Sequence, residues 1–267
     1  MEMEIKNSLT IGQYIPTGSI IHRLDPRTKL ILVLLFMVMV FLVKSILGYI
    51  LLFMFILILI VMSKVQIKYF IRGLKPILIL IIFTVVLQLF FTRGSPIFTL
   101  GPLVITKEGV YLAVFILLRL VLLVFSSSLL TLTTSPMELT NALEYVLAPF
   151  KFIGLPSGEI SMMMTIALRF IPTILEETDR LIKAQSARGV DFESGGLLKK
   201  IKNMVPILVP LFISAFRRAD DLAIAMEARC FQVGAKRTHL KELKFGRLDY
   251  TFTLIFITVV TTVSLLF

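Results

Sequence analysis

Long apolar stretches separated by short polar ones make up most of this chain. Five of them approach or reach the roughly 20 residues that an α-helix needs to cross a bilayer; they are Leu30–Val43, Ile46–Met62, Pro76–Phe91, Val110–Leu132 and Tyr250–Phe267. Hydrophobic residues form 57% of the chain and charged residues only 17%, whereas a soluble domain is about one quarter charged. The pattern therefore predicts an all-α, polytopic membrane protein with about five transmembrane helices.

A block of different character, Thr134–Leu248, lies between the fourth and fifth apolar runs. It contains two long helical patterns, Ser157–Arg188 and Leu197–Arg229. In each, the first half is apolar nearly all round, and the second half has one apolar and one polar face, as in a helix that packs on one side only. We therefore divide the chain into an N-terminal membrane region with four spans (1–133), a helical domain (134–248) and a C-terminal transmembrane helix (249–267).

Several residues predict where helices begin or where loops lie. Asp25 before Pro26 predicts a helix N-terminus, because the carboxylate accepts from free backbone N–H groups and proline is tolerated in the first turn. Ser135 and Glu138 have the spacing of a capping box, in which each side chain accepts from the other residue's backbone N–H. Glycines and prolines within 93–102 indicate a turn-rich loop between the third and fourth spans.

The distribution of lysine and arginine predicts the orientation in the membrane. With the N-terminus inside, 24 of the 28 basic residues lie on the cytoplasmic side, three lie outside, and one, Arg119, lies within a span. The positive-inside rule requires this asymmetry. The helical domain 134–248 is then cytoplasmic and the C-terminus lies outside. The same rule accounts for the net charge of +11, and no basic run is interleaved with aromatic residues, so we expect no nucleic-acid partner.

Two similar tripeptides end the two long helical patterns: Ala187-Arg188-Gly189 and Ala228-Arg229-Cys230. Arginines near helix ends are commonly solvated side chains that suit the carbonyl end of the helix dipole. The repetition favours a second interpretation. Small neighbours leave a guanidinium unobstructed, so its planar fork can bind a carboxylate through two parallel hydrogen bonds. On this interpretation, Arg188 and Arg229 are contacts to other proteins.

Together with other segments, these tripeptides resemble the transmembrane T component of energy-coupling factor (ECF) transporters. The similar segments include Leu24–Lys29, Leu168–Pro172 and Phe216–Arg229, and the resemblance covers essentially the whole chain. In that family the long helices are coupling helices, and each motif arginine docks on one of two ABC-type ATPase subunits. The membrane part carries a separate S component that binds a vitamin or a metal ion. Cys230 departs from the glycine that is common at its position.

The resemblance implies a non-catalytic coupling subunit for micronutrient uptake in the plasma membrane of a prokaryote. The domain 134–248 would be its cytoplasmic coupling domain. Its ATPase-docking residues would be Ala187, Arg188, Gly189, Ala228, Arg229 and Cys230. The chain has no Gly-x-x-x-x-Gly-Lys loop for ATP and only one cysteine, so we expect neither a cofactor nor a metal site.

A polytopic membrane enzyme is the main alternative, because Asp220-Asp221 invites comparison with the paired aspartates of prenyl-transferring enzymes. Such a magnesium site needs a further acid about three residues later, but the chain has Ile224 there, and Arg217 and Arg218 lie close enough to neutralise the pair. We therefore expect surface ion pairs at this position. A self-contained channel or carrier is disfavoured, since the spans hold almost no ionisable groups to line a pathway.

Arg119 is the exception among the spans, about ten residues into the fourth. Leaving it unpaired there costs about 2.5–3.5 kcal/mol on insertion scales. We therefore expect it to reach the interface or to find a polar partner such as Gln88. A contact to the S component is a further alternative.

Overall fold

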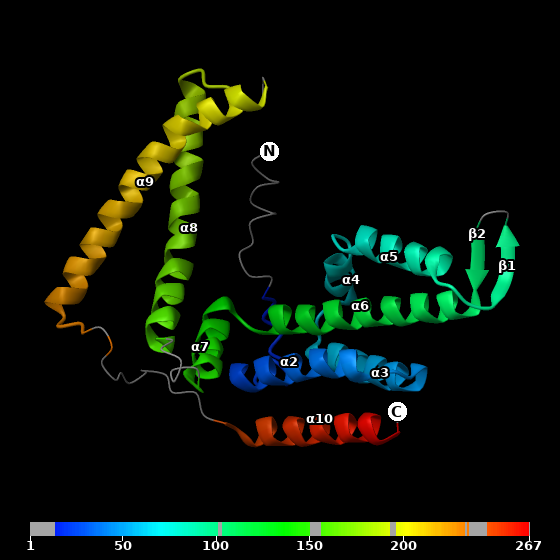
Figure 1. The fold of residues 1–267 in the computed structure, drawn as a ribbon. Coiled ribbons are helices and arrows are strands. Elements are labelled where there is room, and N and C mark those ends of the chain that lie inside the picture. The colour runs from blue at the N-terminus through cyan, green and yellow to red at the C-terminus, as the bar shows by residue number, and fades with distance from the viewer. Residues whose placement is uncertain are drawn as a thin grey trace. The chain divides into compact units, whose positions relative to one another are not determined.

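The computed structural model describes residues 14–100, 103–149, 156–192, 196–232, 234 and 245–266. Its elements (Figure 1) are α2 (Pro26–Leu42), α3 (Ile46–Ser63), α4 (Ile67–Leu74), α5 (Leu78–Phe91), β1 (Pro96–Leu100), β2 (Leu103–Thr106), α6 (Lys107–Thr133), α7 (Pro136–Leu147), α8 (Ser157–Ala187), α9 (Leu197–Ala228) and α10 (Arg247–Leu266). The chain divides into two compact units, one of Met1–Val146 with Lys241–Phe267 and one of Leu147–Leu240. The all-α, polytopic class is confirmed, since the two short strands that the structure describes form no sheet core.

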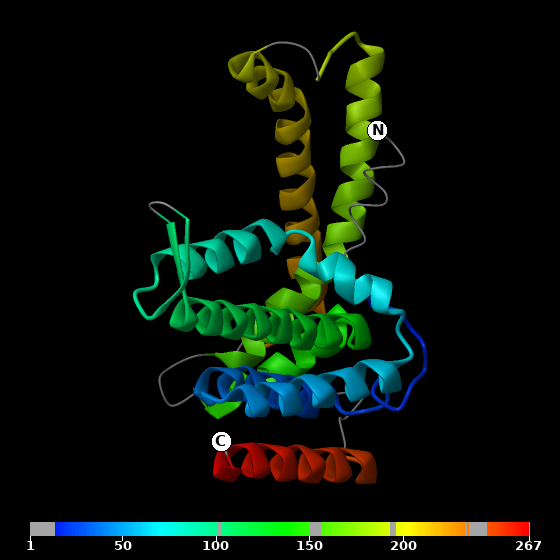
Figure 2. The same ribbon diagram turned by 90° about the vertical axis from the view of Figure 1, so that its right-hand side faces the viewer.

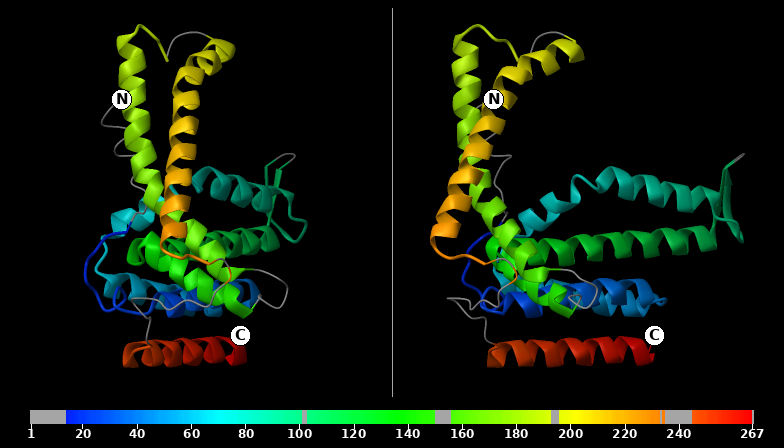
Figure 3. Two further views of the ribbon diagram at one scale, coloured as in Figure 1. Left: turned by 90° about the vertical axis from the view of Figure 1, so that its left-hand side faces the viewer. Right: turned by 60° about the vertical axis from the view of Figure 1, so that its left-hand side comes forward.

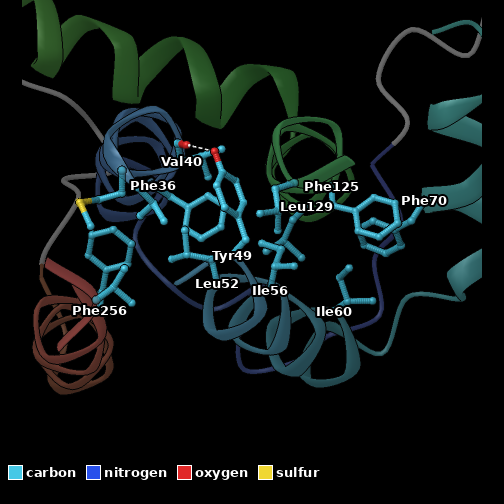
Figure 4. Close-up of a cluster of buried hydrophobic side chains, with 14 of the residues drawn as sticks. Phe36, Val40, Tyr49, Leu52, Ile56, Ile60, Phe70, Phe125, Leu129 and Phe256 are labelled. Carbon is cyan, nitrogen blue, oxygen red and sulfur yellow. Dashed lines mark hydrogen bonds between the residues drawn. The ribbon is translucent and has the colours of Figure 1, made fainter. Parts of the chain in front are cut away.

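The first unit is built around α6, which packs against α2, α3, α4 and α5. Figures 1 and 2 show α6 between α5 and the α2–α3 pair, with α10 on the far side of that pair. One apolar core joins these helices, and its fully buried members include Tyr49, Leu52 and Ile56 of α3 and Leu122 of α6. Figure 4 shows how side chains from α2, α3, α6 and α10 meet in this core.

Within the described residues, length and composition identify three helices that can cross a membrane: α3, α6 and the Gly158–Ala187 part of α8. The bent pair of α4 and α5 is a fourth if it acts as one broken span. At about 1.5 Å per residue, the 17 residues of α2 and the 20 of α10 come close to the ~30 Å hydrocarbon core. We had placed α8 in the cytoplasmic block, with its first half buried or partly in lipid, and charged residues between Glu176 and Lys183 make its second half costly to place in lipid.

Both helix starts expected from capping residues are confirmed. The Asp25 carboxylate accepts from the Arg27 N–H at 2.8 Å, and Pro26 is the first residue of α2. At the start of α7, the Ser135 N–H donates to the Glu138 carboxylate at 3.2 Å, and the Glu138 N–H donates to the Ser135 hydroxyl at 3.3 Å. These reciprocal bonds satisfy backbone groups that the first turn of a helix leaves unpaired.

A β-hairpin stands where the sequence indicated only a turn-rich loop. β1 and β2 pair antiparallel, with Phe98 opposite Ile105 and Leu100 opposite Leu103. β-Branched residues in both segments, together with Phe98 in β1, favour an extended, paired backbone, and this preference outweighs the turn signals around them. The turn prediction rested on 93–96 and on Gly101 and Pro102, and the latter two lie outside the described residues.

We had expected Pro76 to begin the third span, but it does not. It lies in a break of three residues between α4 and α5, where the two helices are bent by 61°. Proline lacks the N–H that a continuous helix needs at this point, although Lys75 before it keeps helical backbone angles, with φ −52° and ψ −47°. Hydrogen bonds between residues three apart, as in a 3₁₀-helix, cross the break. The Ile77 N–H donates to the Leu74 carbonyl at 3.0 Å, and the Leu78 N–H donates to the Lys75 carbonyl at 3.3 Å.

Arg119 is held within the first unit by two aromatic residues. Its Nε donates to the Tyr49 hydroxyl at 3.0 Å, and that hydroxyl donates to the Val40 carbonyl at 2.7 Å. The guanidinium carbon lies 5.2 Å from the centre of the Phe41 ring. Gln88 is not the partner and instead accepts from a side chain one turn further along. The hydrogen bond and the cation–π contact offset part of the cost of this charge in an apolar segment.

We expect Tyr49→Phe to lower the free energy of unfolding by about 1.5–3 kcal/mol, because it removes a hydrogen bond to a charged group inside the core. Tyr111→Phe is the matched control, since Tyr111 is 45% exposed on the same helix as Arg119. Thermal unfolding of both variants in detergent measures the difference. Equal midpoints for the two would show that Arg119 does not depend on Tyr49.

Candidate functional site

Two long helices, α8 with 31 residues and α9 with 32, form the second unit and pack against each other (Figure 3). Pro172 lies inside α8, and Pro206 and Pro210 lie inside α9, without ending either helix. Both predicted helices therefore run to the tripeptides that follow them.

Polar contacts tie the two helices together. Arg218 of α9 donates from Nη2 to Oε2 of Glu177 of α8 at 2.7 Å, with the side chains 34% and 26% exposed. Near the connection between the helices, the Asn203 amide donates to the Asp191 carbonyl at 2.6 Å. A charge-assisted bond at this distance is among the stronger hydrogen bonds in proteins, so it helps to set the pairing of α8 and α9.

Both tripeptides lie where these helices end. Ala187 and Ala228 are the last residues of α8 and α9, and the following arginine is the C-cap in each case. The two arginines have nearly equal backbone angles, with φ −87° and ψ 6° at Arg188 and φ −93° and ψ 14° at Arg229. The similarity seen in the sequence is therefore also a similarity of backbone conformation.

The cap after α8 depends on a left-handed residue, Gly189, whose φ is +85°. Its N–H donates to the Ser186 carbonyl at 3.0 Å, and the Val190 N–H donates to the Gln185 carbonyl at 3.1 Å. These two bonds define a Schellman motif, which satisfies carbonyl groups that the end of a helix leaves unpaired.

The cap after α9 has the same pattern, with Cys230 in the left-handed position at φ +56°. Its N–H donates to the Glu227 carbonyl at 2.8 Å, and the Phe231 N–H donates to the Met226 carbonyl at 3.0 Å. The third position of each tripeptide therefore has a backbone role that its small size alone did not reveal. A side chain in this conformation costs about 1–2 kcal/mol, which glycine avoids.

All six residues of the tripeptides are exposed. Neither Arg188 nor Arg229 forms an ion pair or a side-chain hydrogen bond with any residue that the structure describes. Each guanidinium thus extends from a rigid, capped helix end with its donors available.

The two arginines lie at opposite ends of the helix pair. Just beyond α9, a Cβ at Gly234 would lie 3.9 Å from Oε1 of Glu159, which is in the first turn of α8. Arg188 follows the other end of α8, which at about 1.5 Å per residue is roughly 45 Å long. The structure therefore does not bring Arg188 and Arg229 into one pocket.

The aspartate pair of α9 does not form the expected ion pairs with its neighbours. Arg218 pairs with Glu177 of α8 instead, and Asp220 and Asp221 have no ion-pair partner within the part of the chain that the structure describes. Over the same residues, no group of three or more potential metal ligands occurs.

We expect the reciprocal substitutions Cys230→Gly and Gly189→Cys to have opposite effects on the two caps. Cys230→Gly should stabilise the end of α9 by about 1 kcal/mol, and Gly189→Cys should destabilise the end of α8 by about as much. Both positions have a left-handed backbone, which glycine adopts without the steric cost that cysteine incurs. Hydrogen exchange at the Phe231 and Val190 amides measures each cap separately. Exchange that changes in the same direction in both variants would contradict the left-handed assignment.

Known proteins of one family match almost the whole chain. The family described as Cobalt transport protein (CbiQ) matches residues 17–240. The chain is 56% identical over 244 residues to the energy-coupling factor transporter transmembrane protein EcfT of Clostridium kluyveri, covering 91% of this chain and 90% of that protein. It is 50% identical over 258 residues to EcfT of Ruminiclostridium cellulolyticum, covering 97% of each.

The EcfT protein of Lactococcus lactis is 48% identical over 243 residues, covering 91% of each chain. The chain belongs to the EcfT family. It is therefore the transmembrane component of an energy-coupling factor transporter in a prokaryotic plasma membrane, and a transporter subunit rather than a catalytic enzyme. The resemblance inferred from the tripeptides and from Leu24–Lys29 is confirmed.

The segment Leu24–Lys29 also contributes a buried polar cluster that we did not predict. Lys29 is only 6% exposed, and its ammonium donates to the carbonyls of His22 at 3.1 Å and Thr133 at 3.0 Å. Asp249 of α10 is 5% exposed and accepts from the Asp25 N–H at 2.8 Å. The cluster joins the starts of α2 and α10 to the end of α6. Its sequence signal was a charged pair one turn apart at the start of an apolar run.

Proposed function

We propose that this EcfT chain couples ATP hydrolysis by two cytoplasmic ABC-type ATPase subunits to a membrane-embedded S component, which binds the transported vitamin or metal ion. One observation carries the proposal: α8 and α9 end in the same Schellman cap, and each cap presents an exposed arginine. Two similar helix ends with exposed arginines, tens of ångströms apart, can each bind one copy of the same kind of partner.

In this proposal Arg188 and Arg229 each contact a carboxylate or backbone carbonyls in a groove on its own ATPase. Ala187 and Ala228 keep the approach unobstructed, and Gly189 and Cys230 set the cap that aims the arginine. The helical domain 134–248 is the coupling domain. It lies in the cytoplasm, with the N-terminus also inside and the C-terminus outside, as the distribution of basic residues favours.

The proposed orientation makes Cys230 reachable from the cytoplasm only. A membrane-impermeant thiol reagent should label it in inverted vesicles stripped of peripheral proteins, and should not label it in intact cells. Because the chain has one cysteine, any labelling reports this position. Labelling in intact cells would contradict the orientation.

Affinity purification from native membranes tests the partners directly. We expect two ATP-binding subunits and a small hydrophobic substrate-binding subunit to co-purify with the chain. A chain that purifies alone yet supports uptake in proteoliposomes would overturn the coupling role.

A further inference from the structure

Exposed basic residues gather on α4, which with eight residues is the shortest helix that the structure describes. Lys68 and Arg72 lie within it, and Lys64 and Lys75 flank it; all four are exposed. None of the four forms an ion pair with a residue that the structure describes. This group of positive charges is therefore not neutralised within the described part of the chain.

The basic residues share one side of the helix. Successive residues turn by about 100°, so Lys68, Arg72 and Lys75 fall within a sector of about 60°. Tyr69 lies beside them, with its ring centre 5.2 Å from the Lys68 ammonium and 5.9 Å from the Arg72 guanidinium carbon. These cation–π contacts help to hold the two long side chains in place.

An apolar side of α4 adjoins this basic side. Ile67 and Ile71 are 49% and 57% exposed, although both are large hydrophobic residues. On another side, Phe70 is fully buried, and a Cβ at Gly73 would lie 2.9 Å from the hydroxyl of Ser128 in α6. Close packing on α6 therefore fixes the rotation of α4 and leaves the isoleucines and the basic residues facing outward together.

The position of α4 in the chain, next to apolar helices on both sides, favours a place at a membrane surface. It follows α3, a candidate span, after three residues and is bent by 61° from α5. The bend between α4 and α5 is visible in Figures 1 and 2. If α5 runs along the membrane normal, α4 runs closer to the membrane plane than to the normal. Helices with adjacent apolar and basic sides lie in this way in the interface, with apolar side chains among acyl chains and cations at phosphates.

We infer that α4 is an interfacial anchor that binds anionic phospholipids. Lys68, Arg72 and Lys75 contact the headgroups, and Ile67 and Ile71 insert between the acyl chains. An acidic protein surface would account for the charges but not for two exposed isoleucines beside them on a helix joined to membrane segments at both ends. The inference does not depend on the docking of ATPases at Arg188 and Arg229.

Brominated lipids test this inference at α4 itself. In the full chain, Cys230→Ser removes the single cysteine, and Ile71→Cys then carries a fluorophore. The chain is reconstituted in liposomes of phosphatidylcholine and phosphatidylglycerol at a fixed ratio of 3:1, with bromine on the acyl chains of either one lipid or the other. Both lipids should quench the fluorophore, and phosphatidylglycerol should do so several-fold more strongly per molecule.

Charge removal assigns the preference to particular side chains. A basic residue near an anionic surface raises the affinity for that surface by about five-fold. We define the quenching ratio as the quenching per molecule of phosphatidylglycerol divided by that per molecule of phosphatidylcholine. Lys68→Gln with Arg72→Gln should bring this ratio close to one. Lys199→Gln with Lys200→Gln removes the same charge from exposed positions of α9 and should leave the ratio unchanged.

Several results would overturn the inference. Absence of quenching by either lipid would show that position 71 does not meet acyl chains. A quenching ratio of one in the chain with its basic residues intact would show that α4 does not select anionic lipid. The same conclusion would follow if the preference for phosphatidylglycerol remained after Lys68→Gln with Arg72→Gln. Loss of quenching in the assembled transporter would assign this surface to a protein partner instead.

Discussion

Replacing Arg188 and Arg229 together with glutamate is expected to release both ATPases from the transporter, while the chain still inserts in the membrane. Truncating one partner of a desolvated, hydrogen-bonded charge pair costs about 2–5 kcal/mol, or roughly 30- to 4,000-fold in affinity. Glutamate adds repulsion to that loss if the partner group is a carboxylate. Each single change, Arg188→Ala or Arg229→Ala, should impair uptake before the complex dissociates, because the other arginine still anchors its ATPase.

The same two helices offer a matched control. Arg180 of α8 is exposed, with only a surface contact to Glu176 at 3.9 Å, and Arg217 of α9 is also exposed. Arg180→Glu with Arg217→Glu makes the same change in charge away from the caps, and it should leave ATPase recovery nearly normal. Normal recovery and uptake in the Arg188→Glu, Arg229→Glu variant would leave these arginines as ordinary solvated helix ends.

Lys29→Met is expected to produce the largest loss of stability in the first unit. Lys29 is buried, and its ammonium donates to the carbonyls of His22 and Thr133. Lys29→Met leaves the His22 and Thr133 carbonyls without this donor, and leaving buried acceptors unsatisfied costs about 1–3 kcal/mol each, or about 2–6 kcal/mol together. For a chain of this size, that loss lowers the midpoint of thermal unfolding by roughly 4–24 °C.

Lys44→Met controls for this change, because Lys44 is exposed in the turn between α2 and α3 and the substitution is chemically identical. Its midpoint should shift by less than about 2 °C, as is usual for a surface position. Since the Asp25–Asp249 bond joins α10 to α2, protease cleavage ahead of α10 should also increase in Lys29→Met alone. Equal midpoints for the two variants would show that the cluster does not stabilise the unit.

Local signals predicted the helices of this chain well. Asp25, Ser135 and Glu138 cap helices as expected, because a cap needs only residues within one turn. The ends of α8 and α9 at Ala187 and Ala228 were recognisable for the same reason. At the third position of each tripeptide, the sequence indicated only that the residue is small. It did not indicate the left-handed backbone at Cys230, because that conformation is unusual for a residue other than glycine.

Features that depend on distant residues were not predictable. Arg119 bonds to Tyr49, which lies 70 positions earlier, and nothing in the sequence ranked this tyrosine above Gln88. The Asp25–Asp249 bond spans 224 positions. The pairing of Arg218 with Glu177 required the register of α9 on α8, which periodicity alone does not determine. The β-hairpin was missed because turn residues dominate a short segment in which the strands are brief.

Photo-crosslinking from the two helix ends tests the central claim most directly. A photoreactive amino acid is placed at Ala187, at Ala228 or at both, since these exposed residues directly precede the two arginines. In the assembled transporter, each position should form a cross-link to an ATP-binding subunit, and the doubly substituted chain should carry two such subunits at once. Cross-links from both positions to a single ATPase copy, or to no ATPase at all, would contradict the proposal that α8 and α9 each dock one ATPase.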